Sequence, residues 1–126
     1  MKTIPFVDLT AQHAAIQSEI NSAIDQVLSR CNFILGSQVE EFEQAFARFV
    51  EAEHAVGVSS GLDALRLALM ALDVGPGDEV ILPANTYIAT ALAVSAVGDR
   101  PVLVVCDPET YNIDVGLVEP AMLATL

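Results

Sequence analysis

Apolar residues recur every three or four positions in the first part of the chain and form short continuous runs after it. Between residues 11 and 29 this spacing predicts an amphipathic helix with Thr10 as its N-cap. Residues 3–9 ahead of it are expected to form an extended arm, because Pro5 fixes one dihedral angle and its apolar neighbours need a surface to cover. The apolar face of the helix consists of Ile16, Ile20, Ile24, Val27 and Leu28.

A capping box precedes a second helical stripe. Ser37 and Glu40 have the Ser-x-x-Glu spacing in which each side chain satisfies a backbone N–H of the helix start, so a helix is expected from about residue 38. A stripe of large apolar side chains at helical spacing is typical of a buried face. Its members are Val39, Phe42, Phe46, Phe49 and Val50.

Short apolar runs then alternate with segments rich in alanine and leucine. The runs at residues 55–58, 79–83 and 102–106 predict strands, and the segments at about 62–72 and 89–97 predict helices. The first of these helices is apolar almost all round, which predicts burial on most sides.

Polar side chains mark where the later helices begin. Asn85 or Thr86 is expected to cap the helix that follows the second strand. Asp114 is a candidate cap for a last helix, whose regular part is expected to begin near Glu119 because Pro120 is disfavoured deep inside a helix.

The alternation of strand and helix predicts an α/β fold. Continuous apolar strands indicate a parallel sheet buried on both faces, with right-handed crossovers between neighbouring strands. Ligands of such sheets bind at the carboxyl ends of the strands. That edge is expected to gather residues 60–63, 85–87 and 106–107.

The first strand-to-helix turn, at about residues 58–62, is a candidate anion site. A helix start leaves backbone N–H groups without partners and carries about half a positive charge, which favours an anion such as phosphate. Close packing of strand on helix explains the same small residues equally well. Tyr87 likewise has two interpretations, a stacking face for a flat heterocycle or an aromatic plug of the strand–helix junction.

Charge and cysteine usage exclude several classes of partner. The 17 acidic and 5 basic residues give a formal net charge of −12, which disfavours binding to nucleic acid or to an anionic membrane. The histidines His13 and His54 and the cysteines Cys31 and Cys106 are scattered without metal-ligand spacing. The cysteines are expected to be buried free thiols, as in the reducing cytoplasm.

Neither a secretory signal nor a membrane span is expected. The N-terminus has no apolar core of a signal peptide. The uncharged stretch at residues 80–98 has the length of a membrane helix, but Pro83, Asn85 and Thr86 interrupt it as in a strand, loop and buried helix.

Six segments of the chain stand out together: 4–9 (IPFVDL), 33–36 (FILG), 54–65 (HAVGVSSGLDAL), 75–81 (GPGDEVI), 83–90 (PANTYIAT) and 107–114 (DPETYNID). Together they resemble the DegT/DnrJ/EryC1/StrS family of pyridoxal-phosphate-dependent aminotransferases, which act on nucleotide-linked keto sugars. The resemblance implies the N-terminal part of the aspartate-aminotransferase-like, fold type I large domain, preceded by two helices and with an incomplete sheet. The Gly-Leu-Asp-Ala-Leu sequence looks like the branch that aminates C3 of dTDP-linked 3-keto-6-deoxyhexoses.

The resemblance implies four cofactor-binding residues. The amides around Gly61, Leu62 and Asp63 would hold the phosphate of pyridoxal phosphate, and Tyr87 would stack on its ring. Many relatives have Thr in place of Leu62, so one hydroxyl contact is expected to be lost. Residues 33–36 would lie near the sugar site of a homodimer.

The family's catalytic lysine has no counterpart here. Family members are longer and carry this lysine, and the Asp that pairs with the pyridine nitrogen, further downstream. Lys2, the one lysine of the chain, has no matching context, so no catalytic residue and no metal ligand is assigned. Residues 1–126 are expected to be one partial domain, with the arm and two helices in 1–54 and the start of the cofactor-binding domain in 55–126.

The expected function is transfer of an amino group from an amino acid, with glutamate as the expected donor, to a nucleotide-linked keto-deoxy sugar. The chain is expected to be an N-terminal fragment, inactive alone. Two alternatives remain at this point: a non-catalytic fragment that binds phosphate or another subunit, and a family member with dehydratase or isomerase chemistry.

Overall fold

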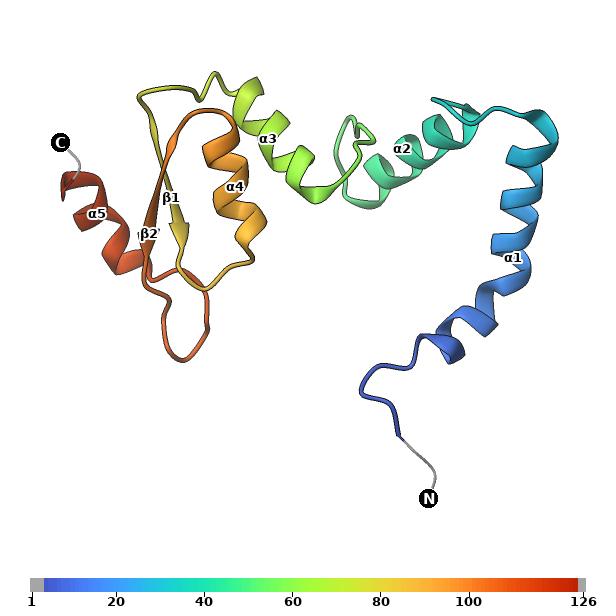
Figure 1. The fold of residues 1–126 in the computed structure, drawn as a ribbon, viewed down its shortest axis with the longest axis horizontal. Coiled ribbons are helices and arrows are strands. Elements are labelled where there is room, and N and C mark those ends of the chain that lie inside the picture. Colours follow the sequence, from blue (N-terminus) through green and yellow to red (C-terminus); the bar gives the residue numbers. More distant parts are fainter. Residues whose placement is uncertain (1–3, 125–126) are drawn as a thin grey trace. The chain divides into compact units, whose positions relative to one another are not determined.

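The computed structural model describes residues 4–124, so Lys2 and Thr3 lie outside the described residues. The chain divides into two compact units, one ending at Gly57 and the other beginning at Val58, and each is described by itself. Figure 1 shows the order of the elements along the chain. The proposed division at residue 54 stays a prediction.

The first unit contains two helices. Helix α1 spans Leu9–Arg30, two residues earlier than predicted, and its N-cap is Asp8 rather than Thr10. The Asp8 carboxylate accepts the Thr10 amide at 2.9 Å, which places Thr10 inside the first turn. The helix ends at Cys31, whose left-handed backbone (φ 51°) closes a bond from its amide to the Leu28 carbonyl.

Helix α2 spans Ser37–Phe49 and has Gly36 as its N-cap. The predicted capping box is wrong, because the helix begins one residue earlier and Ser37 lies within it. Its hydroxyl instead meets Oε1 of Gln38 at 3.4 Å. Glycine is favoured at position 36, since an added Cβ would lie 3.1 Å from the backbone carbonyl oxygen of Asn32.

The aromatic stripe of α2 is exposed, contrary to its predicted burial. The rings of Phe42 and Phe46 stack with centroids 5.7 Å apart, but both side chains and that of Phe49 remain exposed. Only Ala47 of this helix is buried. The prediction failed because helical spacing identifies an apolar face without identifying the surface that covers it.

The second unit is built on two parallel strands. Strands β1 (Glu79–Pro83) and β2 (Arg100–Val104) pair in parallel, from Glu79 opposite Arg100 to Pro83 opposite Val104. Helix α4, Ile88–Ala96, connects them and packs against helix α3, Gly61–Ala71 (Figure 1). The small core of this unit consists of Leu82, Ala93, Val94 and Val104.

The strands match the prediction in part. Strand β1 has the predicted bounds, whereas β2 ends at Val104 because Cys106 forms an isolated antiparallel bridge with Ile113. Residues 55–58 form no strand, so the first of the three predicted strands is wrong. A strand needs a neighbour for its N–H and C=O groups, and β1 and β2 pair only with each other among the described residues.

The later helices also differ from the prediction, in their caps and in their burial. Neither Asn85 nor Thr86 caps α4, because the cap position falls on Tyr87, whose side chain makes no capping bond. Helix α3 has no buried residue, so its predicted burial on most sides is wrong for the described chain. The last prediction is confirmed: Asp114 caps the short 3-10 helix η1, Val115–Leu117, and α5 follows at Val118–Ala124.

Asp99 is an anomaly at the junction of α4 and β2. It is 7% exposed, and neither carboxylate oxygen has a hydrogen-bond partner among the described residues. Burial, with the nearby charge of Asp78 as a second cause, raises the pKa of this carboxyl above its usual range.

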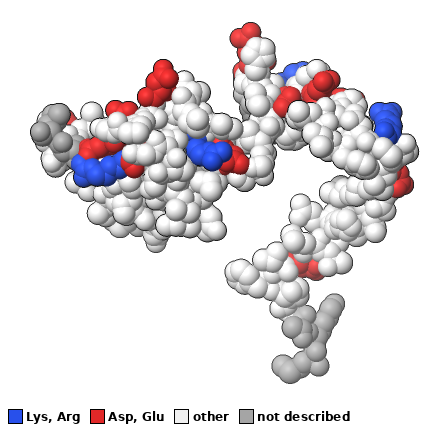
Figure 2. All heavy atoms as spheres, turned by 45° about the horizontal axis from the view of Figure 1, so that its top comes forward, with Lys and Arg blue, Asp and Glu red and all other residues white. Residues whose placement is uncertain are grey.

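Acidic side chains are spread over both units (Figure 2). Within residues 4–124, no cluster of His, Cys, Asp or Glu could hold a metal ion. No helix of this part of the chain is both long and apolar enough to cross a membrane. Both cysteines are free as predicted, but neither is buried: Cys31 is exposed and Cys106 is half-buried.

Candidate functional site

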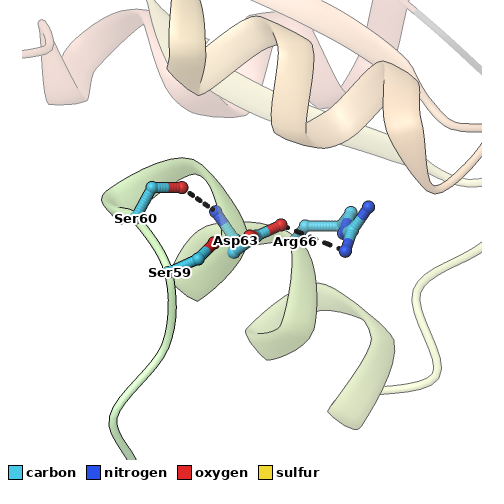
Figure 3. Close-up of polar contacts among 4 residues, drawn as sticks. All are labelled: Ser59, Ser60, Asp63 and Arg66. Carbon is cyan, nitrogen blue, oxygen red and sulfur yellow. Dashed lines mark hydrogen bonds and ion pairs between the residues drawn. The ribbon is translucent and has the colours of Figure 1, made fainter. Parts of the chain in front are cut away.

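The candidate site begins at the turn into α3, where Ser60 is the N-cap. Ser60 has an extended backbone (φ −164°, ψ 166°), and its hydroxyl accepts the amide of Asp63 at 3.2 Å (Figure 3). Serine is among the preferred N-cap residues because its short side chain reaches such an amide. The Asp63 amide therefore already has an acceptor.

The carboxylate of Asp63 joins two other side chains of the turn. It accepts a hydrogen bond from the Ser59 hydroxyl through Oδ2 and pairs through Oδ1 with Nη2 of Arg66 at 3.0 Å (Figure 3). The guanidinium offsets a negative charge that would otherwise repel an anion at this helix start.

The amides of Gly61 and Leu62 remain open. The first hydrogen bonds of the helix come from Asp63 and Ala64, which bond to the hydroxyl and carbonyl oxygens of Ser60. No described group accepts from the two preceding amides. A Cβ placed on Gly61 would meet nothing within 4 Å, so space for a ligand exists. Two free amides at the positive end of a helix suit a phosphate group.

Tyr87 lies at the start of α4, the helix that packs against α3. Its side chain is 79% exposed, so its ring does not plug the junction between β1 and α4. An exposed ring face is available for stacking on a flat ligand. The structure thus places the predicted cofactor-binding residues at the starts of α3 and α4, two helices that pack together. Tyr87 forms no hydrogen bond to the turn at Gly61 among the described residues.

The third segment predicted to lie at the sheet edge, residues 106–107, contains Asp107. Its Oδ1 accepts the amides of Glu109 at 3.0 Å and Thr110 at 2.7 Å, and the Thr110 hydroxyl at 3.0 Å. The hydrogen bonds from Thr110 are the largest cause lowering the pKa of the Asp107 carboxyl. The carboxylate therefore builds its own loop, a role indicated by its place at the start of an Asp-Pro-x-Thr turn.

Tyr111 was not identified from the sequence. It has a left-handed backbone (φ 60°) and a side chain that is 70% exposed. Positive φ is rare for a bulky residue, and no local sequence pattern predicts it here. With Asn85 and Asp107, Tyr111 lines a hollow of about 500 Å³ at the carboxyl ends of β1 and β2.

Comparison with known proteins decides the family. Residues 14–124 match the model of the DegT/DnrJ/EryC1/StrS aminotransferase family. The chain belongs to this family. The resemblance found in the sequence is thereby confirmed.

Individual members of the DegT/DnrJ/EryC1/StrS family extend the match. The chain is 51% identical over 111 residues to the dTDP-3-amino-3,6-dideoxy-alpha-D-galactopyranose transaminase of Aneurinibacillus thermoaerophilus, covering 88% of this chain and 31% of that protein. The solved structure of Streptomyces venezuelae DesV, in complex with a ketimine intermediate, is 48% identical. It superimposes with a TM-score of 0.92, over 96% of this chain and 33% of DesV.

A third member was solved with a cofactor. The structure of NtdA from Bacillus subtilis with bound cofactor PMP is 34% identical, with a TM-score of 0.87 over 96% of this chain and 28% of NtdA. PMP is the amino form of pyridoxal phosphate. These structures confirm the predicted fold, the α/β fold of type I aminotransferases.

The chain spans about a third of the length of these relatives. It contains the helix starts at Gly61 and Tyr87 but no lysine within the described residues. Lys2 stays without an assigned role.

Proposed function

We propose that this chain holds part of the cofactor site of a pyridoxal-phosphate-dependent sugar aminotransferase. The reaction is transfer of an amino group from an amino acid, glutamate, to a nucleotide-linked keto-deoxy sugar. The observation that carries the proposal is the pair of free amides at Gly61 and Leu62, in a family with a member solved with bound PMP.

The residues of the turn have different roles in binding the phosphate. The amides of Gly61 and Leu62 bind phosphate oxygens. The Asp63 amide donates both to the Ser60 hydroxyl and to a phosphate oxygen. Leu62 offers only its amide, because its side chain has no hydroxyl. The ion pair of Asp63 with Arg66 limits repulsion between the carboxylate and the phosphate.

Tyr87 binds the other end of the cofactor. Its exposed ring would stack on the pyridine ring and help to hold the cofactor in place. When bound, the cofactor supplies the electron-withdrawing ring that lets an amino group move between two carbonyl carbons. The chain's own residues bind and orient this group.

We also propose that the protein works as a homodimer with residues 33–36 near the sugar site. Phe33, Ile34 and Leu35 are exposed in the structure. Such apolar side chains are available for contact with a second subunit or a substrate.

An assay of the full-length protein tests this function. With pyridoxal phosphate, glutamate and a dTDP-linked 3-keto-6-deoxyhexose, we expect an amino sugar and 2-oxoglutarate in equal amounts. Tyr87→Ala is expected to weaken cofactor binding about tenfold through loss of the ring contact, whereas Tyr87→Phe keeps the ring and binds nearly normally. Loss of water from the sugar without gain of nitrogen would contradict the proposal.

A further inference from the structure

The hollow lined by Asn85, Asp107 and Tyr111 lies at the carboxyl ends of β1 and β2. Its volume is about 500 Å³, and it shares no lining residue with the turn at the start of α3. Small-molecule sites have volumes of roughly 300 to 1,000 Å³. In parallel sheets the carboxyl ends of the strands are where ligands bind.

The wall of the hollow is held in place by its own hydrogen bonds. The amide of Tyr111 bonds to the carbonyl of Asp107 at 2.9 Å, and the amide of Asp107 bonds to the carbonyl of Asn112 at 2.9 Å. These bonds fix Tyr111 in its left-handed conformation with its side chain exposed. Strained residues with an exposed functional side chain concentrate at binding sites, where fixed geometry lowers the entropy cost of binding.

The negative charge of Asp107 limits which ligands the hollow can bind. Oδ1 of Asp107 is fully engaged by the loop, and no described group bonds to Oδ2. A carboxyl of this kind is ionised at neutral pH, and the hydrogen bonds from Thr110 lower its pKa further. An ionised carboxylate repels phosphate and accepts hydrogen bonds from hydroxyl groups.

The remaining lining fits a sugar ring. The side-chain amide of Asn85 both donates and accepts, and the ring of Tyr111 offers an apolar face. Ala84 and Val105 add apolar surface, which suits the C–H face and methyl group of a deoxysugar. A lining that combines polar groups, an aromatic ring and apolar surface matches a neutral, partly deoxygenated hexose.

We propose that Asn85, Asp107 and Tyr111 bind the neutral hexose ring of the nucleotide-linked sugar. The proposal rests on the proposed function, because that function supplies the sugar. It assigns the sugar ring to the hollow at the strand ends, and it places the negatively charged diphosphate outside it.

Binding of two ligands to the full-length protein tests the assignment. We would titrate dTDP-glucose and dTDP, which lacks the sugar, into the wild type, Asn85→Ala and Tyr111→Gly by calorimetry. Glycine is chosen because it accepts positive φ freely, so removal of the ring relieves strain rather than adding it. Asn21→Ala, on the exposed surface of α1, is the matched control.

Each hollow variant is expected to raise the Kd of dTDP-glucose about five- to tenfold and to leave that of dTDP unchanged. Equal weakening of both ligands, or no weakening by either variant, would overturn the assignment. Weakened binding of glutamate alone would also overturn it, because an ammonium group would then be the ligand of Asp107. Pyridoxal phosphate titrated into the same variants separates this outcome from failure of the cofactor site, since neither substitution touches the turn at Gly61.

Discussion

The carboxylate of Asp63 lies 3.0 Å from the guanidinium of Arg66, one turn along α3. This pair is partly exposed, so its contribution to stability is small. Its larger effect concerns binding, because Asp63 places a negative charge beside the amides proposed to hold phosphate. Removal of Arg66 leaves that charge without a nearby counter-ion.

Arg66→Gln is therefore expected to weaken binding of pyridoxal phosphate about three- to fivefold at low salt, with a smaller effect at high salt as screening increases. Arg66→Lys keeps the charge and is expected to bind almost normally. Fluorescence titration at two salt concentrations measures both effects. An Arg66→Gln protein that binds as tightly as the wild type at low salt would show that the charge of Asp63 does not reach the ligand.

The cap of α3 gives a second prediction. Ser60→Ala removes the acceptor of the Asp63 amide and is expected to cost about 1 kcal/mol, whereas Ser60→Asn keeps an acceptor and costs less. Hydrogen exchange of the Asp63 amide in the full-length protein measures the change locally. Unchanged protection in Ser60→Ala would mean that this amide has another acceptor.

Asp99 gives a prediction on pH. Because burial raises the pKa of this carboxyl, the folded protein holds the proton more tightly than the unfolded chain does. The favourable contribution of the neutral acid is complete below the unfolded pKa, near 3.8, and is lost as pH rises through the folded pKa. Asp99→Asn, which cannot ionise, is expected to be more stable than the wild type at neutral pH.

Denaturation of the full-length protein as a function of pH checks this prediction. The stability gained by Asp99→Asn should shrink as pH falls toward the unfolded pKa. Asp25→Asn, at an exposed position of α1, is the matched control and should show no such trend. A constant difference between Asp99→Asn and the wild type at all pH values would contradict the account.

The pH dependence of stability expected from Asp107 has the opposite sign to that expected from Asp99. Its pKa is lowered chiefly by Thr110, so its stabilising contribution is present above the unfolded pKa and is lost as pH falls through the folded value. Asp107→Ala should remove this dependence, and Thr110→Val should reduce it because one hydroxyl bond disappears. Carbon NMR of the Asp107 carboxyl checks the direction, and a midpoint above the usual range for Asp would refute it.

Local chemistry made part of this structure predictable. The apolar run at Glu79–Pro83 has the predicted bounds, because it lies between strong turn signals. The cap at Asp114 was also predicted correctly. By contrast, Ser37 satisfies the sequence pattern of a capping box but lies one position inside its helix, since several neighbouring residues compete for each cap.

Features that depend on distant residues were not predictable in this way. The run at residues 55–58 has strand composition, but a strand forms only where another strand lies beside it. The left-handed backbone of Tyr111 results from bonds that close the loop at Asp107, not from the preference of tyrosine. In the candidate site, the sequence identified the turn at Gly61 but not the ion pair that balances its charge.

The free amide of Gly61 allows the most direct test of the cofactor site. Gly61 is the first residue of α3, a position where proline is well tolerated and where the extended Ser60 suits a following proline. Gly61→Pro therefore deletes one N–H while keeping the helix. Gly61→Ala is its control, because alanine adds a side chain smaller than that of proline and keeps the N–H.

The decisive measurement is the affinity of the full-length Gly61→Pro and Gly61→Ala proteins for pyridoxal phosphate and for pyridoxal, which lacks the phosphate. We predict that Gly61→Pro binds pyridoxal phosphate about tenfold more weakly than Gly61→Ala, as expected for a lost hydrogen bond to a charged group. The two variants should bind pyridoxal equally. Equal affinity of both variants for pyridoxal phosphate would contradict the claim that the start of α3 holds the phosphate.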